Sequence, residues 1–323
     1  MNNYGRLFRV SIYGESHGKG IGILIDGCPP GLELEEKDFA ADLLRRKGGV
    51  KGTTPRLESD APLIKSGVFN GKTTGAPVLI AFENKDAGSA DYDSLKDTPR
   101  PGHADFTAAK KYSGFNDYRG GGHFSGRLTL GLVAAGVIAK KIIGPVKVTA
   151  TLVEAGGDTD IERAVNKALE MKDSIGGIIQ CEAVNVPVGL GEPFFDSVES
   201  MLSHMMFAIP AVKGIEFGAG FGAARMKGSE CNDPIIEAGG KTGTNHAGGI
   251  NGGITNGNPL LFRVVVKPTS SVSLPQRTVN LQTGEQVDLA IRGRHDTCIA
   301  LRVPVVVECA AAVVLADLTM QNK

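Results

Sequence analysis

The stretch SGRLTLGLVAAGVIAKKIIGP, residues 125–145, carries the strongest fold signal in the chain. Ser125 stands where a helix N-cap is expected and Gly144-Pro145 ends the apolar run, so we predict a helix that runs to about Ile143. Its apolar residues cover most of the helix circumference instead of one face. A helix of this kind must be covered on all sides, and we expect it to lie between two layers of the fold.

Segments on both sides of this helix are rich in β-branched residues and bounded by Gly or Pro, which is typical of strands. They lie at residues 21–26, 63–69, 77–82, 146–153, 177–186, 212–217 and 261–267. Amphipathic patterns predict further helices at 34–47, 159–172 and 196–207, and a last helix from Pro304. The mixture predicts an α+β fold.

A faint repeat links two of these regions. Residues 22–47 run strand, Pro29-Pro30-Gly31-Leu32, acids and helix, and residues 177–207 run strand, Pro187-Val188-Gly189-Leu190, acids and helix. The repeat suggests an internal duplication. Because no Pro/Ser-rich or charged linker divides the chain, we expect one domain over residues 1–323.

The amino-acid composition argues against several classes of protein and of site. Lys plus Arg equals Asp plus Glu, at 35 each, so no overall field would draw the protein to nucleic acid or to a membrane. The apolar stretches are too short or too interrupted for a transmembrane helix, and the N-terminus lacks a signal-peptide core. Five scattered cysteines show no zinc or disulfide spacing. We expect a cytoplasmic protein with no metal site and mostly buried, reduced cysteines.

Four stretches place histidine beside glycine or arginine: residues 14–18, 100–105, 119–127 and 293–296. Glycine allows close backbone approach, arginine binds phosphate or carboxylate in a fork, and histidine exchanges protons near neutral pH. Together they predict an enzyme that acts on an anion.

Each candidate also has an ordinary structural explanation. His17 alone could be a loop histidine bonded to backbone, and Asp105 fits a helix cap better than a catalytic role, whereas His103 favours function. A backbone turn would account for the residue types at 267–271 almost as well as a ligand-binding role would. Asp296 is the best carboxylate base, although a surface ion pair would also account for it.

Residues 119–127 combine a triple glycine with a helix start, which is an anion-binding arrangement as well as a tight turn. Arg127 favours the anion-binding explanation over the tight turn, since a partly buried arginine needs a negative partner. The glycines at residues 18–22 precede a strand, so they do not form a dinucleotide fingerprint. Two glycine-rich loops, 47–55 and 239–257, have the composition of binding loops.

Motifs at residues 14–31, 100–105, 118–127, 245–250, 267–271 and 294–296 resemble those of the chorismate synthase family, in the same order and over nearly the whole chain. The resemblance implies helices sandwiched between antiparallel β-sheets and a homotetramer. It implies a lyase that converts 5-enolpyruvylshikimate 3-phosphate to chorismate by trans 1,4-elimination, with reduced FMN. The short chain implies an external source of reduced flavin, such as a flavin reductase, and leaves NADPH open as an indirect reductant.

The same resemblance assigns roles. His17 would assist phosphate departure, His103 would control protonation of the flavin, and Asp296 would help take a proton there, with Ser125 nearby. The expected anion holders are Arg46, Arg100, Arg127 and Arg294. The expected flavin-binding residues are His123, Phe124, Ser125, Pro210, Ala211, Gly252, Lys267, Pro268, Thr269, Ser270, Ser271 and Arg294.

Some positions depart from the family pattern. His123-Phe124 stands where many members carry Arg-Ser, and Pro210 replaces a common Asn.

Two other functions stay open from the sequence: a polyanion-binding module that uses residues 47–56, and a flavin-binding member without turnover. Balanced charge and few aromatics argue against the first, and the presence of all candidate acids and bases argues against the second.

Overall fold

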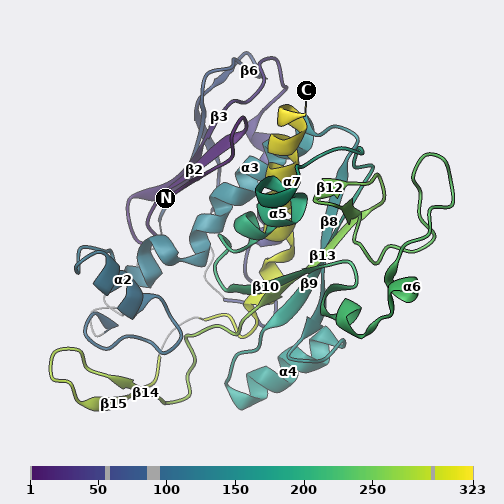
Figure 1. The fold of residues 1–323 in the computed structure, drawn as a ribbon. Coiled ribbons are helices and arrows are strands. Elements are labelled where there is room, and N and C mark those ends of the chain that lie inside the picture. The colour runs from purple at the N-terminus through teal and green to yellow at the C-terminus, as the bar shows by residue number, and fades with distance from the viewer. Residues whose placement is uncertain (1, 55–58, 86–94, 292–294, 323) are drawn as a thin grey trace.

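Two long helices, α3 (Thr129–Ile142) and α7 (Pro304–Gln321), pack together between two antiparallel sheets (Figure 1). The structure is a computed structural model, and it describes residues 2–54, 59–85, 95–291 and 295–322. The expectation of helices sandwiched between antiparallel sheets is confirmed.

The first sheet has the strand order β1-β2-β3-β7-β4, and the second has the order β10-β13-β9-β8. The first comprises β1 (Asn3–Tyr4), β2 (Arg9–Gly14), β3 (Gly20–Asp26), β7 (Val78–Glu83) and β4 (Leu63–Ser66). The second comprises β10 (Val212–Phe217), β13 (Leu260–Val266), β9 (Gly177–Val184) and β8 (Lys147–Ala155).

Shorter elements complete the fold. The other helices are α1 (Ala40–Arg46), α2 (Asp105–Lys111), α4 (Ile161–Met171), α5 (Val198–Met206) and α6 (Gly228–Cys231). The hairpins are β5 (Val68–Phe69) with β6 (Lys72–Thr73), β11 (Ile250–Asn251) with β12 (Ile254–Thr255), and β14 (Gln276–Val279) with β15 (Gln286–Leu289). Short 3-10 turns, η3 (Arg119–Phe124), η4 (Gly126–Leu128) and η7 (Ile299–Arg302), precede the two central helices.

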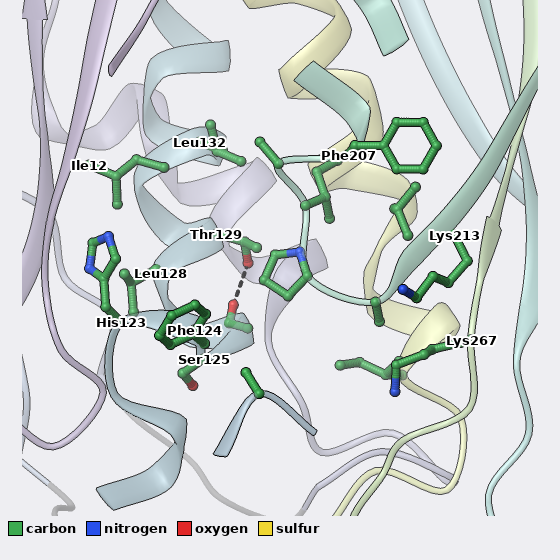
Figure 2. Close-up of a pocket in the computed structure, with 18 of the residues that line it drawn as sticks. Ile12, His123, Phe124, Ser125, Leu128, Thr129, Leu132, Phe207, Lys213 and Lys267 are labelled. Atoms are coloured by element: carbon green, nitrogen blue, oxygen red, sulfur yellow. Dashed lines mark hydrogen bonds between the residues drawn. The ribbon is translucent and has the colours of Figure 1, made fainter. Parts of the chain in front are cut away.

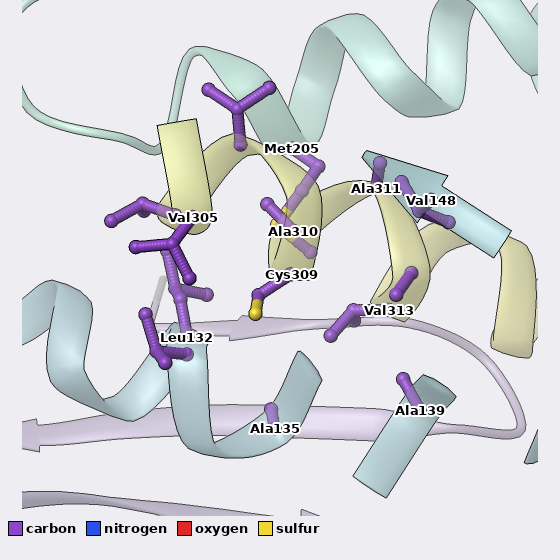
Figure 3. Close-up of a cluster of buried hydrophobic side chains, with 14 of the residues drawn as sticks. Leu132, Ala135, Ala139, Val148, Met205, Val305, Cys309, Ala310, Ala311 and Val313 are labelled. Atoms are coloured by element: carbon purple, nitrogen blue, oxygen red, sulfur yellow. The ribbon is translucent and has the colours of Figure 1, made fainter. Parts of the chain in front are cut away.

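The contact between α3 and α7 is unusually close. A Cβ atom on Gly136 would lie 2.1 Å from the Cβ of Cys309, so only glycine fits at this point. Figure 3 shows the small side chains of Ala135 and Ala139 from α3 on the same side as Leu132, facing α7. Dispersion and apolar burial therefore hold the two helices at short range along the middle of the molecule.

α7 is also long and apolar enough for a membrane span by length and composition, but 78% of it is buried inside the fold. It is therefore a core helix. Glu308, one of the two buried carboxylates of this helix, accepts hydrogen bonds from Arg45 at 2.8 and 2.9 Å and from Lys140 at 2.5 Å. These ion pairs tie α1 and α3 to α7.

Apart from unmatched elements such as α4, which lies between β8 and β9, the two halves of the fold have the same order of elements. Strands β2 and β3, helix α1, strand β4, hairpin β5–β6, strand β7 and helix α3 are matched by β8, β9, α5, β10, β11–β12, β13 and α7. The strand orders β2-β3-β7-β4 and β8-β9-β13-β10 are therefore equivalent. This correspondence supports the internal duplication suggested by the sequence.

The repeated Pro-x-Gly-Leu segments make the same contacts in both halves. Thr73 donates its hydroxyl to the carbonyl of Pro29 at 2.6 Å and accepts the amide of Leu32 at 2.9 Å. In the second half, Thr255 donates to the carbonyl of Pro187 at 2.7 Å and accepts the amide of Leu190 at 2.9 Å.

Most predicted elements lie within a few residues of their observed bounds, and two differences have physical causes. The strand predicted at 63–69 is split at Gly67, whose φ of +83° breaks the extended backbone. The α-helix predicted from Ser125 starts at Thr129 because residues 126–128 form the 3-10 turn η4. Ser125 caps this turn, accepting the amide of Arg127 at 3.3 Å. All five cysteines are free and four are buried, as expected.

We predict that Thr73→Val and Thr255→Val destabilise the protein by similar amounts. Each replacement leaves a buried amide and a carbonyl without their hydroxyl partner, which costs about 2 kcal/mol of unfolding free energy. Urea denaturation of the two variants, with Thr107→Val on exposed α2 as control, measures this. A large loss for one variant and none for the other would contradict the equivalence of the two halves.

Candidate active site

Two adjoining cavities lie where the connection from β7 to α3 meets the connection from β13 to α7. The larger has a volume of about 710 Å³ and the smaller about 210 Å³. They share five lining residues: Gly120, Ser125, Gly126, Thr269 and Ile299. A ligand in one cavity would therefore lie against a ligand in the other.

The larger cavity is mainly apolar, with cations at one side. Figure 2 shows Ile12 and His123 on one side, Phe124 and Ser125 below, and Lys213 with Lys267 on the opposite side. Burial, together with nearby Lys213, lowers the pKa of Lys267. A flat apolar molecule with an anionic end matches this lining in size and polarity.

The triple glycine of η3 brings two histidines to the cavities. A Cβ on Gly120 would lie 2.2 Å from Cε1 of His17, and one on Gly121 would lie 3.3 Å from Cε1 of His103. All three glycines, residues 120–122, have positive φ. Their side-chain-free backbone thus lets His17 enter the smaller cavity and His103 the larger.

His103 belongs to a fixed charge cluster. Its Nδ1 lies 2.6 Å from Oδ1 of Asp105, and the guanidinium of Arg100 donates to both carboxylate oxygens of Asp105 at 2.8 Å. Burial opposes ionisation of Asp105, but hydrogen bonds from Arg100 and His103 outweigh it and hold the pKa of its carboxyl well below the usual range. The sequence predicted that Asp105 caps α2, and this prediction is wrong because the side chain of Asp105 binds Arg100 and His103 instead.

The smaller cavity is dominated by cations. Its lining includes Arg46, Lys47, Arg100, Arg127 and Arg302, against the carboxylates of Asp60 and Asp296. Burial, followed by the repulsion of neighbouring Arg302, lowers the pKa of Arg46 to about 9. With five basic side chains and two carboxylates in the lining, a bound anion would be strongly favoured.

Asp60 holds two of these guanidinium groups. It accepts Nη1 of Arg127 at 3.0 Å and lies 3.9 Å from Nη1 of Arg46. Arg46 also donates to the carbonyl of Gly126 at 2.8 Å and to the hydroxyl of Thr129 at 3.2 Å. The buried arginine of the 119–127 motif thus has a protein carboxylate as partner, in addition to any ligand.

Asp296 faces the same cavity and is fixed on both oxygens. Its Oδ1 accepts the amide of Thr54 at 3.0 Å, and its Oδ2 accepts Nη2 of Arg302 at 2.9 Å. The residue is 8% exposed, so the alternative of a surface ion pair is wrong. The loop at 47–54 therefore closes one wall of the cavity through its backbone.

The structure brings most sequence-predicted residues to these cavities. The larger is lined by His103, His123, Phe124, Ser125, Pro210, Ala211, Lys267, Pro268, Thr269, Ser270 and Ser271. The smaller is lined by His17, Arg46, Arg100, Ser125, Arg127 and Asp296. The second group comes from segments that are up to 279 residues apart in the chain, between positions 17 and 296.

Two predicted residues are not placed there. Gly252 lines neither cavity, because its hairpin packs at the start of α5, where a Cβ on Gly253 would lie 2.7 Å from that of Ser197. The cavity meets the other end of α5, at Met205. The rest of the loop at 239–257 also stays outside both linings. Arg294 lies outside the described residues.

Sequence reasoning missed three charged residues of the cavities. Arg302 had a usable signal, since it is a cation in an apolar run close to the start of a predicted helix, as Arg127 is. Lys213 begins a predicted strand and resembles an ordinary surface lysine. Asp60 belongs to no motif, and only the fold brings it to Arg127.

Comparison with known proteins gives one consistent result. The family model described as chorismate synthase matches residues 8–320. The chorismate synthase of Chitinophaga pinensis is 64% identical over 98% of this chain and 96% of its own. That of Thermococcus gammatolerans is 47% identical over 99% and 98%. A crystal structure of chorismate synthase covers 99% of this chain and 93% of its own with a TM-score of 0.77 and 27% identity.

We predict that acid destabilises the protein partly through Asp105. The pKa of this carboxyl is depressed in the folded state, so its stabilising effect is complete above its unfolded pKa, near 4, and is lost as the pH falls below that value. Between pH 6 and pH 3 the wild type should lose about 1 kcal/mol more unfolding free energy than Asp105→Asn. Equal losses in urea titrations at the two pH values would refute this assignment.

Proposed function

The chain belongs to the chorismate synthase family, so it is a lyase that converts 5-enolpyruvylshikimate 3-phosphate to chorismate and phosphate, and we propose that it uses reduced FMN bound in the larger cavity. This reaction is the last common step of the shikimate pathway to aromatic amino acids. The observation that carries the proposal is the shared wall of an apolar cavity and a guanidinium-lined one.

The larger cavity fits FMN by the chemistry of its lining. Phe124, Leu128 and Pro210 offer apolar surface for a flavin ring, and Lys213 with Lys267 offers charge for a phosphate. Thr269, Ser270 and Ser271 add hydroxyl groups. When bound, reduced FMN supplies an electron donor and hydrogen acceptor for an elimination whose departing hydrogen is not acidic.

The smaller cavity fits the phosphorylated substrate. Arg46, Arg100 and Arg127 line it, and the carboxylates of Asp60 and Asp105 fix their guanidinium groups in place. We assign these arginines to the phosphate and carboxylate groups of the substrate, which they would bind in fork geometry. We also assign an anion-binding role to Arg294.

His17 is the proposed proton donor to the departing phosphate. It is 7% exposed, lines the smaller cavity and packs against Gly120. A protonated imidazole at this place would neutralise the charge that builds on the leaving oxygen as its bond to carbon breaks. Ser125 lines both cavities, so its hydroxyl would lie at the boundary between substrate and cofactor.

His103, in the larger cavity, and Asp296, in the adjoining smaller cavity, are the proposed residues that handle the proton at the cofactor. Nδ1 of His103 is held by Asp105, which leaves Nε2 to hold or release a proton in the larger cavity. Asp296 would accept a proton at its carboxylate, which Thr54 and Arg302 keep in a fixed position. Gly252, which lines neither cavity, has no part in this arrangement.

Several wider properties belong to the same proposal. We expect the chain to act as one domain in a homotetramer in the cytoplasm. We expect it to take reduced flavin from an external flavin reductase, with NADPH as the indirect reductant. No helix in the described part of the chain provides an unburied membrane span.

The proposed cofactor and the role of His103 are tested by one anaerobic assay. Purified protein with reduced FMN should turn over the phosphorylated enol ether, and His103→Ala should lower kcat by about 100-fold or more, as for loss of a proton-transfer group. Thr107→Ala, on the exposed face of the helix α2 that follows His103, is the control. Turnover without flavin would sink the cofactor proposal, and full activity of His103→Ala would remove its assigned role.

Gly120→Ala should impair catalysis through His17, because the atoms nearest to the new Cβ belong to His17 and Ser16, which line the smaller cavity and not the larger. The new methyl group would occupy the space of the imidazole, at 2.2 Å from Cε1, and the residue has a φ of +57°. We expect kcat to fall by about 100-fold, because a misplaced catalytic group costs that much, while FMN binding measured by fluorescence stays within threefold of wild type. Gly114→Ala, also at positive φ but with no neighbour within 4 Å, is the matched control. Normal kcat in Gly120→Ala would show that this contact does not position His17.

A further inference from the structure

His295 lines the smaller cavity and has no assigned role in the reaction described above. Its Nε2 is buried and has no hydrogen-bond partner among the described residues. Two other buried atoms on this lining are in the same state, Oγ1 of Thr269 and Nε of Arg302. A buried polar atom without a partner costs about 1–3 kcal/mol, so such an atom beside a cavity indicates where a small turn of the side chain towards a ligand would complete the bonding.

The three atoms differ in how far their side chains are otherwise engaged. Arg302 is held by Asp296 through Nη2, and Thr269 lines both cavities. His295 differs because none of its ring atoms has a hydrogen bond within the described part of the chain, although its side chain is partly buried. Its position is therefore set by packing and by the backbone next to Asp296.

Its surroundings favour the uncharged form of the ring. Burial, and then the nearby guanidinium of Arg100, lower the pKa of His295, and the carboxylate of Asp296 only partly opposes them. The ring therefore adds a hydrogen-bond donor to the cavity without a sixth positive charge beside the five basic side chains of the lining. A lysine or arginine there would add to the repulsion that Arg46 already experiences.

We propose that Nε2–H of His295 donates a hydrogen bond to an anionic oxygen of the bound phosphorylated substrate, and that His295 is a substrate-positioning residue and not a proton-transfer group. The inference rests on the proposed function, because it assigns the smaller cavity to that substrate. The contact would be present in the ground state and in the transition state alike. Its loss should therefore weaken substrate binding and leave the chemical step nearly unchanged.

The test compares His295→Phe with His295→Gln. Phenylalanine keeps the ring and removes the donor, whereas the amide nitrogen of glutamine can replace Nε2–H. Substrate affinity is measured with oxidised FMN present, which avoids turnover, and kcat and KM are measured with reduced FMN. Circular dichroism and thermal melting establish that each variant is folded, and His295→Ala replaces the phenylalanine variant if that one does not fold.

We expect His295→Phe to raise both Kd and KM for the substrate by about 10- to 100-fold, the effect of one hydrogen bond to a charged group. Its kcat and its affinity for FMN should stay within about threefold of wild type, and His295→Gln should recover most of the substrate affinity. A Kd within twofold of wild type in His295→Phe, a loss confined to kcat, or equal impairment in both variants would overturn the inference. Failure of the wild type itself to bind the substrate would instead refute the proposed function.

Discussion

The close crossing of α3 and α7 is the constraint on which the rest of the structure depends. The helices approach so closely that Gly136 has no room for a side chain against Cys309, and each helix carries a sheet on its outer side. The apolar surfaces of both sheets are thereby buried on a shared helical layer. The carboxylate of Glu308 within this layer is tolerated because Arg45 and Lys140 surround it. A wider separation of the two helices would loosen both the core and the loops attached to their N-terminal ends.

Those loops explain why a duplicated fold has one asymmetric site. The equivalent connections, from β7 to α3 and from β13 to α7, meet each other through contacts such as Ser270 Oγ to the carbonyl of Gly102 at 2.8 Å and Arg100 to Ser271 at 3.1 Å. Each connection ends in a 3-10 turn that delivers one arginine, Arg127 or Arg302, to the smaller cavity. The cores of the halves are alike, whereas the connections differ in sequence and length, so function resides in the parts that the duplication left free to diverge.

The sequence predicted the fold well where local patterns decide the structure. The apolar run at 129–142 and the β-branched strands are set by periodicity, and the Pro-x-Gly-Leu repeat revealed the two halves. Residues of the cavity lining were predicted where the functional side chains stand in short motifs. An example is the stretch in which Gly120 packs against His17 and Gly121 against His103. What could not be predicted depends on contacts distant in the chain: Asp60 is 67 residues from Arg127, its partner. Asp105 was mistaken for a cap although its partners, Arg100 and His103, stand in the same motif, because the sequence does not show which way its side chain turns.

The carboxylates of the site explain how so many cations can share one small cavity before a ligand arrives. Asp60 supports Arg127 and Arg46, Asp105 supports Arg100, and Asp296 supports Arg302, so each guanidinium is oriented by protein groups. Because only Asp60 and Asp296 line the cavity itself, positive charge remains in excess and favours an anion of several negative charges. The free-energy cost of orienting the guanidinium groups is therefore incurred during folding and not during binding. When the leaving group departs from the bound anion, the donors around it do not need to move. A neutral donor is the one addition that such a cavity accepts without further repulsion, and the uncharged imidazole of His295 satisfies that condition.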